Sequence, residues 1–172
     1  IATKLKSPGE TIDSWTDILQ NEVLSLNGRY GAINGLVSLK GNVVAFQDRA
    51  VSFISINPRV QVQASDGIAL ELGYGQVLQE YKYISTNSGS LNKWGIVPTE
   101  SGIFYLDLIN KSFNVVEGES VRGISSSDGF HKFFLDNLKQ EWLIQDNPVL
   151  HKGVSIGWDK VTSDVYLSLF NE

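Results

Sequence analysis

Three β-hairpins are the sequence feature that most constrains the fold of this chain. Each reads as an apolar strand, a polar turn holding Asp, Asn or Lys, and a second apolar strand. The expected strand pairs are 43–46 with 50–56, 103–107 with 113–118, and 154–158 with 165–170. They recur at intervals of roughly 50 to 60 residues, which is typical of a β-propeller with long blades or of a large sandwich. The sequence therefore predicts an all-β fold of repeated β-hairpins, propeller-like and either complete or partial.

Turn residues place two further strands. The dipeptides Asn27-Gly28 and Gly41-Asn42 are strong turn signals, and the residues between them predict a strand over 33–39. Asn57-Pro58 ends the strand over 50–56, because proline cannot donate a backbone hydrogen bond inside a sheet. Residues 94–97 lead into the polar turn 98–102 and are expected to pair with 103–107.

One short helix is predicted near 129–139. Ser125 to Asp128 supply candidate N-caps. One apolar stripe then follows at positions i, i+3, i+4 and i+8, made by Phe130, Phe133, Phe134 and Leu138. We expect this helix to pack across a strand edge or between blades, and a partner-binding helix is the alternative.

The first 26 residues read differently from the rest. Ile12, Trp15 and Ile18 fall at helical spacing, yet an extended connector that carries Trp15 into a neighbouring core fits equally well. We therefore expect an N-terminal connector over 1–26 and a β-hairpin-rich domain over 27–172. A chain that starts at Ile1 and holds no Met is expected to be part of a longer chain, the alternative being loss of a leader.

Composition excludes several classes of protein. Hydrophobic residues make up 42% and charged residues 19%, which is ordinary for a folded domain. The absence of Cys excludes disulfides and thiolate metal sites. The net charge is −5 without any run of Lys or Arg, which argues against specific nucleic-acid binding. No apolar stretch approaches the roughly 18 residues of a membrane span.

The sequence offers no convincing chemistry. A zinc site needs about four closely placed ligands, and we interpret the two histidines, His131 and His151, as surface residues. No nucleophile elbow with Gly two residues either side of Ser occurs. Gln47 and Asp48 are expected to cap backbone donors in the first hairpin turn. We therefore predict no catalytic, cofactor-binding or metal-binding residue, no cofactor and no enzyme activity.

Six stretches carry a resemblance to a known family. They are 13–16 (Asp-Ser-Trp-Thr), 27–35, 44–51 with 55–59, 83–86, and 101–107. Together they resemble a large virion protein of crAss-like and related short-tailed bacteriophages of gut bacteria, a tail component similar to the muzzle or nozzle at the distal end of the tail tube. The resemblance covers about residues 13 to 140, and the last 30 residues match less clearly.

The resemblance implies a structural role in the virion tail. Such a protein is expected to assemble with other copies of itself in a ring or tube that conducts DNA and closes the distal tail, in contact with other virion tail proteins. An acidic chain suits a conduit, because it repels the duplex. At a subunit boundary we expect one of four tryptophans, Trp15, Trp94, Trp142 or Trp158. The alternative function is a glycan- or receptor-binding β-propeller module.

Overall fold

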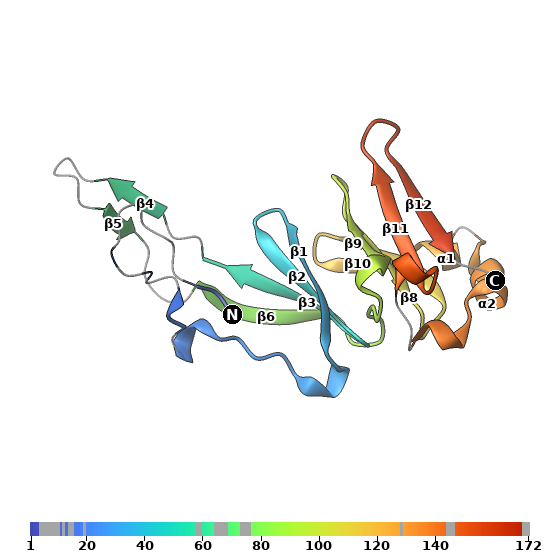
Figure 1. Cartoon of the computed structure of the whole chain (residues 1–172), viewed down its shortest axis with the longest axis horizontal. Coiled ribbons are helices and arrows are strands. Elements are labelled where there is room, and N and C mark those ends of the chain that lie inside the picture. The colour runs from blue at the N-terminus through green and yellow to red at the C-terminus, as the bar shows by residue number, and fades with distance from the viewer. Residues whose placement is uncertain are drawn as a thin grey trace. The chain divides into compact units, whose positions relative to one another are not determined.

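The computed structural model describes residues 1–3, 11, 13, 16–18, 20–57, 60–63, 69–72, 77–127, 129–143 and 147–169. Most of its elements are strands (Figure 1). They are β1 Ile33–Leu39, β2 Asn42–Gln47, β3 Val51–Ile56, β4 Val60–Gln63, β5 Ala69–Leu72, β6 Leu78–Ser85, β7 Ile96–Pro98, β8 Ile103–Asp107, β9 Ser112–Glu117, β10 Ser120–Gly123, β11 Val154–Asp159 and β12 Asp164–Leu169. The helices are α1 Ile124–Ser127 and α2 His131–Asn137, with the 3₁₀ turns η2 Gln20–Glu22, η3 Gly28–Tyr30, η4 Lys93–Gly95, η5 Gln140–Leu143 and η6 Pro148–Leu150.

The strands form two four-stranded sheets and two hairpins. One sheet has the order β1-β2-β3-β6, and the hairpin β4–β5 lies between its third and fourth strands in the sequence. The other has the order β10-β9-β8-β7, so that four consecutive strands pair with their neighbours. The strands β11 and β12 form a two-stranded sheet of their own. Both four-stranded sheets are therefore meanders that follow chain order.

The chain divides into two compact units, and the division falls within β3 and β6. Unit 1 comprises residues 1–26 and 54–81, and holds the hairpin β4–β5. In it, the N–H of Ala2 donates to the carbonyl of Glu22 at 3.0 Å. Unit 2 comprises residues 27–53 and 82–172, and contains both hydrophobic cores described below.

The tight turns follow from local chemistry. Leu39 pairs with Asn42, which leaves Lys40 and Gly41 as a two-residue loop with φ of 49° and 82°. Two successive positive φ angles characterise the turn whose twist suits a hairpin, and glycine adopts the second without strain. In the last hairpin, the Asp159 carboxylate accepts a hydrogen bond from the N–H of Val161 at 2.8 Å, as Asp does in a turn.

The first core lies in unit 2, between the parts of the two four-stranded sheets that belong to this unit. Phe46 and Val44 on β2 and Val51 on β3 contribute from one sheet, and Ile103 and Tyr105 on β8 from the other. All five are fully buried. Since residues two apart in a strand share a face, Ile103 and Tyr105 both point into this core.

The second core lies on the other face of β8. Leu106, next to Tyr105 in sequence, belongs to it together with Phe134 of α2, Trp142 of η5 and Ile156 of β11. The rings of Phe113 and Phe134 stack with centroids 6.2 Å apart. The sheet β7–β10 is thus buried on both faces, by the first sheet on one side and by α2 and the last hairpin on the other.

The coarse expectation of a chain built from β-hairpins is confirmed. All three expected hairpins form, as β2–β3, β8–β9 and β11–β12, and the strand expected over 33–39 is β1. Strands β4, β5, β6 and β10 were not predicted. Trp94 and Gly95 were expected in a strand and lie instead in η4, with only Ile96 to Pro98 continuing as β7. The described residues form no closed ring of sheets, so the propeller stays a prediction.

The expected helix is present but shorter, and a second one precedes it. Helix α2 spans His131–Asn137, and the serines expected as its N-caps belong to α1 instead. Its N-cap is Phe130, which makes no side-chain cap. Of the expected apolar stripe, Phe134 and Leu138 are buried, whereas Phe130 and Phe133 are 57% and 49% exposed. Of the residues expected at helical spacing within the 1–26 connector, Ile12 and Trp15 lie outside the described residues.

Candidate functional site

A buried polar side chain with three hydrogen bonds, Gln47, lies at the end of β2 in unit 2. It is 2% exposed. Its Nε2 donates to the carbonyls of Asn27 at 3.1 Å and Gly31 at 2.8 Å. Its Oε1 accepts from the hydroxyl of Tyr83 at 3.0 Å, and that hydroxyl accepts from the N–H of Asn27 at 3.1 Å. One buried amide therefore ties the segment before β1 to β2 and β6.

Gln47 does not act as the sequence predicted. It was expected to cap backbone donors of its own turn, but its side chain donates to carbonyls 16 and 20 residues away. The side chain of Asp48 also points to another segment, because its Oδ1 accepts from Nδ2 of Asn34 at 2.6 Å. The partners are distant in sequence, so no local pattern could have indicated them.

Hydrogen bonds to both sheets hold the loop that joins them, residues 86–92. The N–H of Ser90 donates to the carbonyl of Gln47 at 3.0 Å, and its hydroxyl donates to the carbonyl of Leu106 at 3.1 Å. The neighbouring N–H of Gly89 donates to Oδ2 of Asp107 at 3.3 Å. The last residues of β2 and β8 therefore fix the connection between the sheets.

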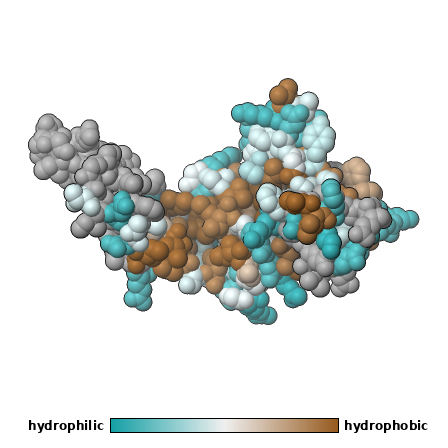
Figure 2. Space-filling view, viewed as in Figure 1, coloured by the Kyte–Doolittle hydropathy of each residue, from teal (hydrophilic) through white to brown (hydrophobic). Residues whose placement is uncertain are grey.

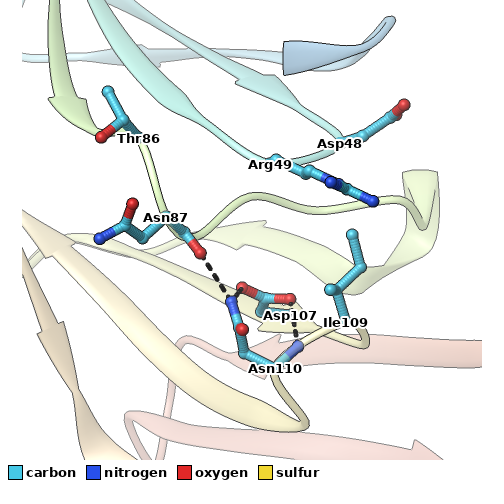
Figure 3. Close-up of a pocket in the computed structure, with 7 residues that line it drawn as sticks. All are labelled: Asp48, Arg49, Thr86, Asn87, Asp107, Ile109 and Asn110. Atoms are coloured by element: carbon cyan, nitrogen blue, oxygen red, sulfur yellow. Dashed lines mark hydrogen bonds between the residues drawn. The ribbon is translucent and has the colours of Figure 1, made fainter. Parts of the chain in front are cut away.

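A shallow polar depression of about 360 Å³ opens beside this loop (Figure 3). The turn after β2, the start of the loop and the turn after β8 line it, through Asp48, Arg49, Thr86, Asn87, Asp107, Ile109 and Asn110. The Asp48 carboxylate points away from Asp107 in Figure 3. The two acids do not converge as a pair that shares a substrate.

The Asp107 carboxylate stabilises the turn that follows β8. It is 1% exposed. Oδ1 accepts from the N–H of Asn110 at 2.9 Å, and Oδ2 accepts from Nδ2 of the same residue at 2.7 Å. That Nδ2 also donates to the carbonyl of Asn87 at 2.7 Å. With Gly89 as a third donor, this carboxylate accepts three hydrogen bonds from protein groups, which fits a structural role.

The two histidines belong to different segments of the chain. His131 is exposed at the first position of α2, and His151 is exposed with a φ of 53°. Among the described residues, no group of three His, Asp or Glu side chains could hold a metal ion. No helix in the described part of the chain is long and apolar enough to cross a membrane.

The four tryptophans have different environments. Trp142 is 5% exposed in the second core, and Trp158 is half-buried on β11. Trp94 is 56% exposed in η4. Trp15 lies outside the described residues. Of the three described tryptophans, Trp94 has the largest surface left for a neighbour.

Comparisons with known proteins give one consistent result. A family model described as Crassvirus muzzle protein matches residues 1–172. The muzzle protein of Bacteroides phage crAss001 is 35% identical over 167 residues, which is 96% of this chain and 12% of that relative. The chain thus spans about an eighth of the length of the relative it matches.

These matches first define a class: the chain is a structural protein of a bacteriophage, a component of the virion tail. Within that class it belongs to the crassvirus muzzle protein family. The resemblance read from the sequence is therefore confirmed at the level of the family.

Proposed function

We propose that this chain is a non-enzymatic structural part of the muzzle that assembles with other copies of itself into a ring or tube. That assembly conducts DNA, closes the distal end of the tail and contacts other virion tail proteins. The observation that carries the proposal is the match of the muzzle family over residues 1–172.

Charge supports the conduit role. The chain carries a net charge of −5. Affinity for a duplex comes from Lys and Arg that neutralise phosphates, so an acidic wall does not retain DNA that passes along it. The connection between the sheets in unit 2, fixed by Ser90 and Gly89, supports a stiff wall.

The sheet topology supports blades of a propeller-like array. A propeller blade is a four-stranded antiparallel sheet, and blades follow one another along the chain. The sheets β1-β2-β3-β6 and β7-β8-β9-β10 have this form and this order. Their buried faces meet through Phe46 and Tyr105, whose ring centroids are 5.1 Å apart.

The proposal includes the domain organisation of the chain. Residues 1–26 serve as a connector, and 27–172 form a β-hairpin-rich segment of a longer muzzle polypeptide. The 12% coverage of the crAss001 relative supports this. Peptide mapping of virion proteins tests it: peptides from 27–172 are expected in a band far larger than 19.0 kDa. A 19.0 kDa band alone would contradict it.

Imaging of intact particles tests the function. Cryo-electron microscopy of purified virions is expected to place unit 2 in a ring around the distal tail axis. Absence of the protein from purified virions would overturn the proposal. Binding of the isolated chain to bacterial surface glycans, without ring density, would favour the receptor-binding alternative instead.

A variant of Trp94 tests the assembly, because we place this residue at a boundary between copies. Trp94→Ala is expected to weaken assembly while leaving the unfolding free energy nearly unchanged, since the side chain is 56% exposed. Leu36→Ala, at another exposed apolar side chain (63%), is the control and is expected to assemble normally. Equal assembly of both variants would remove Trp94 from the interface.

A further inference from the structure

The dipeptide Asn-Gly occurs twice in the sequence, as Asn27-Gly28 and as Asn34-Gly35. Asparagine is a chemically labile residue, and it loses its side-chain amide most readily before glycine. Glycine has no Cβ, so its backbone nitrogen can approach the asparagine side chain without hindrance. Both dipeptides lie in unit 2 and their surroundings differ, so the two can be compared within one molecule.

Asn27-Gly28 lies at an exposed turn before β1. Both residues are exposed, and Gly28 begins the 3₁₀ turn η3. Figure 2 shows a hydrophilic surface at the lower centre of the view, where this segment leads into β1 in Figure 1. A Cβ built at Gly28 would meet nothing within 4 Å, so the backbone has room to move. Oδ1 of Asn27 accepts from the N–H of Arg29 at 3.0 Å, and Nδ2 has no partner among the described residues.

Asn34-Gly35 is held by its surroundings. Both residues are half-buried in β1. Nδ2 of Asn34 donates to Oδ1 of Asp48 at 2.6 Å and to the carbonyl of Ser90 at 2.9 Å. A Cβ built at Gly35 would collide with the side chain of Ile96. Loss of this amide therefore requires two hydrogen bonds to break and the strand to open.

We propose that Asn27 is a site of spontaneous deamidation in the folded protein, whereas Asn34 is protected. The backbone nitrogen of Gly28 gives up its proton and forms a bond to Cγ of Asn27. The bond from Cγ to Nδ2 breaks, and Nδ2 leaves with that proton as ammonia. One water molecule then opens the five-membered imide ring at either carbonyl, which gives aspartate or isoaspartate.

Closure of the ring needs local opening of the turn. Asn27 has an extended backbone with ψ of 115°, and the ring forces ψ away from that value. The rotation displaces the Asn27 carbonyl, which accepts from Nε2 of Gln47 at 3.1 Å. An exposed turn opens at a lower free-energy cost than a paired strand. The difference in opening cost therefore favours reaction at Asn27 over reaction at Asn34.

The isoaspartate product changes the segment that Gln47 holds. Its backbone runs through the former side chain of residue 27, with one additional methylene and a new carboxylate. The carbonyl that accepts from Gln47 is then displaced, and of the two carbonyls bound by Nε2 only that of Gly31 remains in place. A buried donor left without its acceptor destabilises the fold. Deamidation is therefore expected to loosen the connection between the segment before β1 and the sheet.

Peptide mapping of the full chain tests the site. Trypsin cleaves after Arg29, so Asn27 and Asn34 fall in different peptides, and fragment ions locate the new acid. In the folded chain at mildly alkaline pH, deamidation is expected to be about tenfold or more faster at Asn27 than at Asn34. In guanidinium chloride both sites should react at similar rates, because the folded surroundings are lost. Equal rates in the folded chain, or no reaction at Asn27, would overturn the proposal.

Gly28→Ala tests the mechanism. The position is open and its φ is not positive, so the fold should be retained. The added methyl group hinders the backbone nitrogen, and reaction at Asn27 should slow by about tenfold. Gly157→Ala, at an equally open position on β11, is the matched control and should react like the original chain. An unchanged rate in Gly28→Ala would contradict attack by the nitrogen of residue 28.

Denaturation of incubated samples tests the consequence. After incubation, the original chain and Gly157→Ala should unfold at a lower guanidinium chloride concentration than fresh samples, whereas Gly28→Ala should shift much less. Equal shifts in all three chains would overturn the link between deamidation and the Gln47 contact. These outcomes do not depend on assembly of copies, so absence of the protein from virions would overturn the proposed function alone.

Discussion

The rings of Phe46 and Tyr105 meet with centroids 5.1 Å apart and planes inclined by 59°, and both residues are fully buried. Phe46 comes from β2 and Tyr105 from β8, so this one contact joins the two four-stranded sheets. Tilted aromatic pairs contribute about 0.5–1.5 kcal/mol beyond their buried area. The contact therefore contributes directly to the packing of one sheet on the other.

Removing one ring should destabilise unit 2 strongly. Phe46→Ala is expected to lower the free energy of unfolding by about 3–5 kcal/mol, because it leaves a cavity between the sheets. Phe133→Ala, at a ring that is 49% exposed, is the control and should cost much less. Urea denaturation measures both. Equal losses for the two variants would mean that the inter-sheet core is not the main source of stability.

Alkaline pH should destabilise the fold through Tyr105. Burial raises the pKa of this phenol above its usual value of 10.0, and the Asp107 charge adds to the rise although the Ser88 hydrogen bond opposes it. Above pH 10.0 the unfolded chain loses the phenol proton while the folded chain keeps it. Stability should therefore be full below that pH and fall above it, by up to about 1.4 kcal/mol per pH unit.

Tyr105→Phe separates this effect from general alkaline unfolding. The variant loses the 2.8 Å contact between the Tyr105 and Ser88 hydroxyls, at a cost of about 1 kcal/mol at neutral pH. Its stability should fall less steeply between pH 9 and 11 than that of the original chain, as followed by chemical denaturation. Identical pH profiles would show that Tyr105 does not control the transition.

Replacing the buried amide of Gln47 with a carboxylate should lower the stability of the fold. Gln47→Glu keeps the shape of the side chain but removes both N–H donors to the carbonyls of Asn27 and Gly31. We expect a loss of about 2–4 kcal/mol at neutral pH, because a buried charge would face two acceptors. Gln79→Glu, at an exposed amide on β6, serves as the control. Thermal denaturation of both variants gives the comparison, and a stable Gln47→Glu protein would refute the proposed role.

The loop between the sheets should not accept a side chain at Gly89. A Cβ there would meet the carbonyl oxygen of Gln47 and the N–H groups of Arg49 and Ala50, all of them backbone atoms that cannot rotate away. Gly89→Ala is expected to cost about 1–3 kcal/mol or more. Gly157→Ala is the matched control, since a Cβ at that position on β11 meets nothing within 4 Å. Should both variants unfold at the same temperature, the close approach at Gly89 would be wrong.

Features that depend on residues close together in the sequence were predicted correctly, whereas features that depend on distant residues were not. The hairpins β2–β3, β8–β9 and β11–β12 were predictable because their turns and alternating strands are adjacent in sequence. Strand β6 was missed: its partner β3 is separated from it by the inserted hairpin β4–β5. Half of the α2 stripe was misjudged, because periodicity predicts one apolar face but not how much of it a neighbour covers. Short motifs indicated the family. They did not predict the hydrogen bonds of Gln47, whose partners are 16 and 20 residues away.

Local sequence was enough to predict which residues turn and which extend, because φ preferences and side-chain alternation act over a few residues. Its motifs were also sufficient to indicate the family. Which strands became neighbours, and which polar side chains were buried, depended on how the whole chain packs. Gln47, Asp107 and Gly89 acquire their roles only when loops distant along the chain meet. Burial leaves backbone groups that must find partners wherever the fold brings them. These partners lie on other segments of the chain, so the sequence of one segment does not reveal them.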